Sequence, residues 1–217
     1  LFRVPVTRSI FPVQSTRAEL TPDRVGWFHV SQLHAATPTE VQQEVSRLRK
    51  LGADRHILDL RGCQGGDITS AAGVADLFLP ESAVVVRLVE PGVGEQDLTA
   101  AGPQLVDEEL VVLVNRWTQG AGEALAIALQ EHSRAYVIGE PTMGSARVET
   151  LLPLGRGLVL RLDSVRLESP TGHSWQGRGL IPDMPVEVQV VLQPSGPGAA
   201  PDHSDQQFQM EIGRAHV

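Results

Sequence analysis

The chain has 217 residues, of which 41% are apolar and 20% are charged, and its formal net charge is -8. That amount of apolar material can build one sizeable core, which excludes a wholly disordered chain. An acidic chain is a poor candidate for nonspecific binding to nucleic acid or to an anionic membrane. The single cysteine, Cys63, excludes an internal disulfide and a cysteine-rich zinc site. No apolar run reaches the roughly 18 residues that a membrane-spanning helix needs.

The first half of the chain alternates between strand-like and helix-like patterns. β-branched and aromatic residues favour a strand at Val25–Val30. Thr37-Pro38-Thr39-Glu40 has the form of a capping box with proline at the first helical position, and Gly52 is placed to end the helix that follows. The continuous apolar run Ala83–Leu88 is typical of a parallel strand covered on both faces. The other elements predicted in this half are a strand at 55–60 and a helix at 68–79.

The second half continues the alternation. Leu110–Val114 is the cleanest buried strand, and it leads into a predicted helix at about 123–131, whereas residues 90–103 are rich in turn formers. A strand at 135–138 and a β-hairpin with arms at 148–154 and 157–165 complete the predicted elements. Strands and helices in this order imply right-handed crossovers and a mainly parallel sheet. The predicted fold class is therefore α/β, with a mainly parallel sheet plus a β-hairpin.

Two glycine-rich loops each join a predicted strand to a predicted helix. The first runs from Gly62 to Gly66, and the second contains Gly120-Ala121-Gly122. Each places backbone N–H groups at a helix N-terminus, where negative charge is favoured. If the loops lie side by side, one N–H from each can form an oxyanion hole, although either loop alone is more simply explained as a tight turn. Neither loop has the spacing of a phosphate-binding loop, so a nucleotide site is not expected.

Five short motifs follow one another in a fixed order. They are Ile57-Leu-Asp-Leu-Arg61 with Gly65-Gly66, Val74-Ala-Asp-Leu-Phe-Leu-Pro80, Leu113-Val-Asn115 with Gly122-Glu123, Arg134-Ala-Tyr-Val-Ile-Gly-Glu-Pro-Thr142, and Ser169-Pro-Thr-Gly172 with Gln176-Gly-Arg-Gly-Leu-Ile-Pro-Asp183. Together they resemble the S41 family of serine peptidases, the carboxyl-terminal processing or tail-specific peptidases. The resemblance covers about residues 4–188, and the opening Val4-Pro-Val-Thr-Arg8 is similar to the last strand of the PDZ domain that precedes this core in the family.

The resemblance implies a ClpP/crotonase-like core of β-β-α units and cleavage near the C-termini of protein substrates. The family's serine nucleophile is activated by a lysine base, while two backbone amides hold the oxyanion; by resemblance these amides are those of Gly66 and Ala121. The expected partner is a polypeptide substrate or a C-terminal peptide, with no nucleic acid, no membrane span in this fragment, no cofactor and no metal. The family resemblance also implies an extracytoplasmic location, periplasmic or in the cell envelope.

The sequence departs from the family at the two positions that carry the chemistry. In Thr118-Gln119-Gly120-Ala121-Gly122-Glu123, the position of the nucleophilic serine holds Gly120. In Gly144-Ser145-Ala146-Arg147-Val148-Glu149, the position of the lysine holds Ser145, and that of an assisting glutamine holds Glu149. The sequence therefore predicts an S41-like domain that is proteolytically inactive or impaired and that retains a polypeptide-binding cleft.

Two other readings stay open at this point. The chain could be an active hydrolase with a rearranged catalytic set that uses Thr118, Cys63 or Glu149, with His34 or His56 approaching as a proton acceptor. Thr118 is more simply explained as a helix cap, and the only lysine, Lys50, as a solvated residue at a helix C-terminus. Alternatively, the domain is a non-enzymatic ligand-binding module, for which a large apolar pocket would be the sign.

The predicted domain organisation has three parts. Residues 1–16 form the end of a preceding PDZ-like domain and a linker, residues 17–191 form the peptidase-like core, and residues 192–217 form a linker and tail. Residues 193–205 are rich in Pro, Gly, Ala and Ser, as linkers are. Ile212-Gly-Arg-Ala-His-Val217 resembles a translated sequencing adapter, so we expect it to be an artefact and the chain to be a fragment of a longer protein.

Overall fold

The computed structural model describes residues 14–186. The PDZ-like strand at residues 4–8, the linker at 193–205 and the adapter-like tail at 212–217 lie outside the described residues. Within the described part, no helix is long and apolar enough to cross a membrane.

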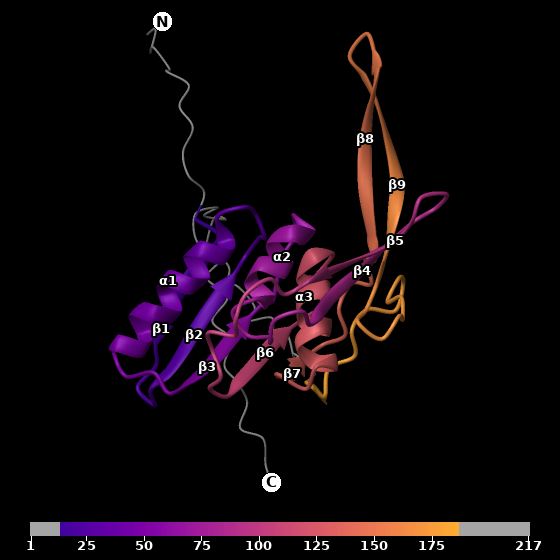
Figure 1. Cartoon of the computed structure of the whole chain (residues 1–217). Helices are drawn as coiled ribbons and strands as arrows, with labels where there is room; N and C mark the ends of the chain where they lie inside the picture. Colours follow the sequence, from indigo (N-terminus) through magenta and orange to yellow (C-terminus); the bar gives the residue numbers. More distant parts are fainter. Residues whose placement is uncertain (1–13, 187–217) are drawn as a thin grey trace, which may run out of the picture. The chain divides into compact units, whose positions relative to one another are not determined.

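A six-stranded sheet forms the centre of the fold, with strand order β1-β2-β3-β6-β7-β10 (Figure 1). Its edge strand β1 is antiparallel to β2, and all the other neighbours are parallel. The predicted α/β fold with a mainly parallel sheet is confirmed. The strands are β1 (Thr16–Leu20), β2 (Val25–Val30), β3 (Arg55–Asp59), β6 (Leu110–Val114), β7 (Tyr136–Gly139) and β10 (Met184–Pro185).

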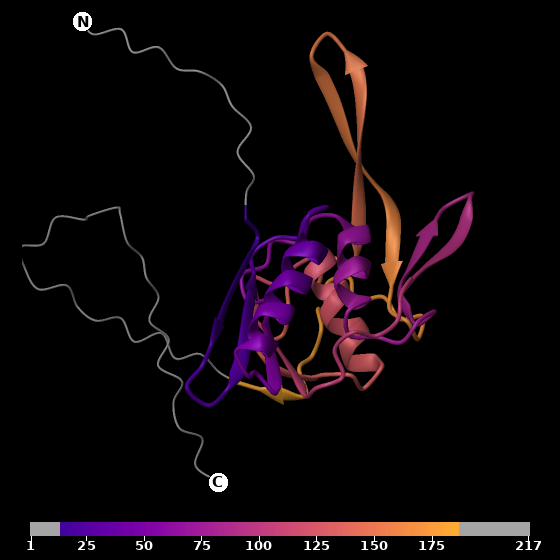
Figure 2. The same cartoon turned by 60° about the vertical axis from the view of Figure 1, so that its left-hand side comes forward.

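Three helices of the described residues connect successive parallel strands. They are α1 (Thr37–Lys50) after β2, α2 (Ile68–Ala75) after β3, and α3 (Ala121–Glu131) after β6. Because β2, β3, β6 and β7 follow one another in one direction across the sheet, right-handed crossovers place all three helices on the same face. Figure 2 shows the helices together on that face.

The core lies between this helix layer and the sheet. Cross-strand register aligns Phe28, Leu58, Val112 and Val137 in one row across β2, β3, β6 and β7, and all four are fully buried. Each such side chain contributes about 1.5–3 kcal/mol relative to an exposed one. The two strand-to-helix loops therefore follow strands whose core-facing side chains are fully buried.

A second, four-stranded sheet has the order β5-β4-β9-β8 and is antiparallel throughout. It comprises β4 (Val84–Glu90), β5 (Gly94–Thr99), β8 (Arg147–Gly155) and β9 (Leu158–Glu168). The predicted hairpin is confirmed as β8 and β9. The prediction of a parallel strand covered on both faces at 83–88 is wrong, because β4 pairs antiparallel with both neighbours and only Val85 and Val86 are buried along it. The polar strand β5 was not predicted, since it has no apolar alternation.

The predicted capping box of α1 is also wrong. The helix N-cap is Ala36, with no side-chain cap, so Thr37 is already helical. The Thr37 hydroxyl instead accepts from the N–H of His34 at 3.0 Å and lies 2.8 Å from the Ser15 hydroxyl. The Glu40 carboxylate accepts from the Ser15 N–H at 3.1 Å, so the tertiary contact with the chain before β1 replaces the local cap.

Candidate active site

The two glycine-rich loops lie side by side, as the sequence predicted. They follow β3 and β6, which are adjacent parallel strands with Asp59 opposite Leu113. A Cβ atom on Gly65 would lie 2.9 Å from the Gln119 carbonyl oxygen and 3.4 Å from the Ala121 nitrogen. Gly65 also has φ +76°, so only glycine permits this close approach of one loop to the other.

Gly120 is the N-cap of α3, with φ 55° and ψ -119°. Residues with side chains rarely adopt this conformation, and it costs them about 1–3 kcal/mol. Space is not the obstacle, because a Cβ atom there would meet only the Gly65 Cα, at 3.9 Å. Strained strand-to-helix turns of this kind present nucleophiles in other hydrolases. Here the turn is present, but the residue at its apex has no side chain to attack with.

The Glu123 carboxylate joins the Gly120 turn to the loop at residues 142–145. It is fully buried, three residues into the helix from Gly120. Its Oε2 accepts from the N–H of Gly120 at 3.0 Å and from that of Ser145 at 2.7 Å. Its Oε1 accepts from the N–H of Gly144 at 2.7 Å and from the Thr142 hydroxyl. Positions 120 and 145 are therefore brought together by one shared oxygen atom.

Glu123 organises the candidate site, and the sequence did not single it out as an individual group. Its signal was a glutamate three residues after a helix N-cap, the position from which a side chain reaches back to the N-cap amide. With glycine at the N-cap only that return bond can form, because glycine has no side chain to complete the box. The two further bonds to the 144–145 amides are tertiary and leave no local sequence pattern.

Of the other residues predicted for the site, Ser145 lies in it and Glu149 does not face it. Ser145 is partly buried beside the Gly120 turn. Glu149 is an exposed residue of β8, and its carboxylate is ion-paired with Arg161 across the hairpin. An exposed carboxylate that is held by an arginine is a poor general base for a group in the turn.

Thr118 ties the two loops together rather than capping α3, so the predicted cap is wrong. Its hydroxyl donates to the Leu60 carbonyl oxygen at 2.8 Å and accepts from the Asn115 N–H at 3.1 Å. The Asn115 side chain in turn accepts from the Gly62 N–H at 3.0 Å. Because the fully buried Thr118 hydroxyl is engaged on both sides, it is not available as a nucleophile.

The Asp59–Arg61 pair fixes the start of the first loop. The Arg61 Nε donates to Asp59 Oδ1 at 2.8 Å and its Nη2 to Oδ2 at 2.6 Å, while His29 Nδ1 lies 3.8 Å from Oδ2. Burial alone opposes ionisation of Asp59, but the hydrogen bonds from Arg61, with the nearby His29, outweigh it and lower the pKa of this carboxyl to about 2.

This pKa predicts a loss of stability in acid. An Asp with its pKa lowered by folding stabilises the protein above its unfolded pKa, and the contribution disappears as the pH falls through the folded value. We expect Asp59 to contribute about 2 kcal/mol at pH 7, lost between about pH 5 and pH 2. Denaturant titrations across this range should show a weaker acid dependence for Asp59→Asn than for the native chain, and equal pH profiles would contradict the assignment.

Three further candidates from the sequence, Cys63, His56 and His34, are held in structural roles. Cys63 is fully buried, and burial raises the pKa of its thiol to about 11, which opposes thiolate formation. His56 is also buried, at the start of β3 and therefore at the opposite end of the sheet from the loops. Burial lowers the pKa of its imidazole, which packs 5.4 Å from the Phe28 ring. His34 lies in the turn before α1, where its Nδ1 accepts from the Ala36 N–H.

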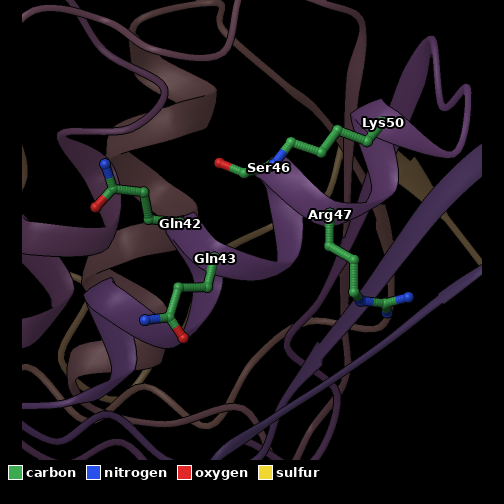
Figure 3. Close-up of a pocket in the computed structure, with 5 residues that line it drawn as sticks. All are labelled: Gln42, Gln43, Ser46, Arg47 and Lys50. Carbon is green, nitrogen blue, oxygen red and sulfur yellow. The ribbon is translucent and has the colours of Figure 1, made fainter.

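Lys50 is on the surface of α1, away from the glycine-rich loops. Since α1 runs from the end of β2 back to the start of β3, its last residue lies at the opposite end of the sheet from the Gly120 turn. Figure 3 shows Lys50 lining a shallow surface pocket with Gln42, Gln43, Ser46 and Arg47, all from α1. Within residues 14–186, no three His, Cys, Asp or Glu side chains are grouped as metal ligands would be.

A family model described as peptidase family S41 matches residues 24–186. The chain belongs to peptidase family S41. It is 34% identical over 212 residues to the carboxyl-terminal-processing protease of Picosynechococcus sp., covering 96% of this chain and 50% of that protein. It is 35% identical over 190 residues to that of Synechocystis sp., covering 86% and 44%. A solved photosystem II D1 C-terminal processing protease matches with a TM-score of 0.72 at 26% identity, covering 83% of this chain and 50% of that one.

This S41 domain therefore spans about half the length of the curated relatives it matches. The family match includes both glycine-rich loops, Glu123 and the loop at 142–145. It thus covers the whole region in which the structure brings positions 120 and 145 together.

Proposed function

We propose that this S41 domain is proteolytically inactive and binds polypeptide chains, including their C-terminal ends, at the Gly120 turn. The single observation behind the proposal is the pairing of Gly120 with Ser145 at the Glu123 carboxylate. A serine peptidase needs an attacking oxygen and a base at adjacent positions. Gly120 has no such oxygen, and a serine hydroxyl at 145 is no base near neutral pH.

Anion binding does not need the missing side chains. The proposed oxyanion amides are those of Gly66 and Ala121, and among the described residues neither N–H donates a hydrogen bond to protein. Ala121 is the first residue of α3, where the helix dipole favours negative charge. A peptide carbonyl or terminal carboxylate at this point would receive hydrogen bonds of the kind that stabilise an oxyanion. The family also supports an extracytoplasmic location for the whole protein.

The loss of proteolysis is tested by incubating the full-length protein with β-casein, an unfolded substrate, and with a fluorophosphonate probe. We expect neither cleavage nor labelling at the turn. Cleavage that disappears when a residue of the two loops is substituted would show a rearranged catalytic set and refute the proposal.

Retained binding is tested with a fluorescent peptide that ends in a free carboxylate. We expect the amidated peptide to bind more weakly, because a charge-assisted hydrogen bond is lost. Ala121→Pro removes one of the two proposed amides at a helix position where proline is tolerated. It should weaken the binding of the peptide with a free carboxylate by about tenfold, which is the effect of losing one such hydrogen bond. Equal binding by the native chain and by an Ala121→Pro variant of unchanged melting temperature would exclude this amide from the site.

A further inference from the structure

The hairpin formed by β8 and β9 has one apolar face. Cross-strand register places Leu152 opposite Leu160, and residues two positions away along a strand share that face. This adds Leu158 and Leu162. We call these four residues the leucine face, and each of them is between 40% and 64% exposed. Leu154, beside the irregular pairing near the turn, is exposed as well.

The opposite face of the hairpin carries charged residues, and these are paired with one another. Arg161 is ion-paired with Glu149, and Arg147 Nη1 lies 3.3 Å from Asp163 Oδ2. Val159, opposite Pro153, is an exposed apolar residue of this face. The leucine face, in contrast, presents exposed leucines and carries no ion pair among the described residues.

The outer edge of the hairpin is open too. β8 is the last strand in the order β5-β4-β9-β8, so one row of its backbone N–H and C=O groups has no neighbouring strand among the described residues. Figures 1 and 2 show the hairpin extending well beyond the helices. A two-stranded ribbon is marginally stable in water, and an exposed apolar face next to an open edge marks an interaction surface.

The dimensions of this surface decide what it can bind. β8 has 9 residues, which at about 3.3 Å per residue gives a length of roughly 30 Å. Two strands about 4.8 Å apart make a strip roughly 10 Å wide, or about 300 Å². A stable dimer needs about 800 Å² from each partner, so the strip alone is too small for one. It matches a single extended polypeptide of about nine residues added to the edge of the sheet.

The strip is also continuous with the Gly120 turn. β8 begins at Arg147, two residues after Ser145, and the N–H of Ser145 shares an oxygen of Glu123 with that of Gly120. A polypeptide with one end at the turn can therefore pass directly onto β8.

We propose that β8 and the leucine face bind the extended part of the polypeptide whose end occupies the Gly120 turn. The bound segment adds as a strand to the open edge of β8 and places alternate apolar side chains on the leucine face. This inference rests on the proposed function and specifies its substrate class, namely unfolded segments with apolar residues at every second position.

The test compares two fluorescent peptides by anisotropy. The short one has about four residues, ends in a free carboxylate and reaches only the turn; the long one adds about ten residues with leucine at alternate positions. We expect the long peptide to bind the native chain at least about tenfold more tightly. Leu152→Ser combined with Leu160→Ser should remove this gain. Val159→Ser, on the opposite face, should keep it.

Each other outcome overturns the inference. If both peptides bind equally to the native chain, the hairpin contributes nothing while the proposed function of the turn survives. If neither binds, both proposals fail. An equal loss with Val159→Ser would show that the leucine face is not the determinant. Sedimentation that reveals a native dimer, dissolved by Leu152→Ser with Leu160→Ser, would make this face an interface between copies of the chain.

Discussion

The combined substitution Gly120→Ser with Ser145→Lys is expected to give this S41 protein the peptidase activity that we propose the native sequence lacks. The geometry supports it, because the backbone of residue 120 has the bend of a nucleophile turn and position 145 is tied to it through Glu123. A serine side chain has room, since its Cβ would lie 3.9 Å from the nearest atom. The strain of a side chain at this φ costs about 1–3 kcal/mol, which a packed turn can tolerate.

The expected size of the gain follows from what such groups contribute elsewhere. Removing a serine nucleophile costs about 10⁶ in kcat in a well-studied serine peptidase. Even imperfect placement should therefore raise β-casein hydrolysis by the full-length protein at least about 10³-fold over the native background.

The matched controls are the two single substitutions. Gly120→Ser alone lacks a base, and Ser145→Lys alone lacks a nucleophile, so neither should exceed the native background substantially. Activity in the native chain, or full activity in Ser145→Lys alone, would show that a different residue attacks. A fluorophosphonate label confined to position 120 of the double variant would confirm the mechanism.

Glu123→Ala is expected to be among the most destabilising single substitutions in the domain. It leaves four donors without their acceptor: the amides of Gly120, Gly144 and Ser145, and the Thr142 hydroxyl. Each buried donor left unsatisfied costs about 1–3 kcal/mol. We expect a loss of about 4 kcal/mol in the free energy of unfolding and a fall in melting temperature of roughly 10 °C, measured by denaturant titration and calorimetry.

Glu149→Ala provides the control for a carboxylate that is exposed and only ion-paired. Such pairs contribute about 0–1 kcal/mol, so its stability should stay close to that of the native chain. Glu123→Gln keeps the shape of the side chain but turns an amide N–H₂ toward two of the four donors. Its free energy of unfolding should therefore lie between those of Glu123→Ala and Glu149→Ala. A change below about 1 kcal/mol for Glu123→Ala would mean that the carboxylate does not organise the turn.

Local patterns predicted the parts of the fold that depend on short-range chemistry. The apolar run Leu110–Val114 and the glycines that follow it predicted β6 and the turn into α3. Local patterns gave wrong predictions where tertiary contacts determine which hydrogen bonds a side chain makes. Thr37 looks like a cap but bonds to Ser15, and Thr118 looks like a cap but joins the two loops through Leu60.

The sequence by itself determined the family, and it predicted which residues stand at the two positions expected to be catalytic, because residue type fixes the chemistry of each side chain. Only the tertiary structure decided which groups meet. Gly120 and Ser145 are 25 positions apart along the chain, and they adjoin because the Gly120 turn and the 142–145 loop both donate to one buried carboxylate, that of Glu123. The four leucines of the hairpin likewise form one face only through cross-strand register, which depends on pairing between strands and not on either strand alone.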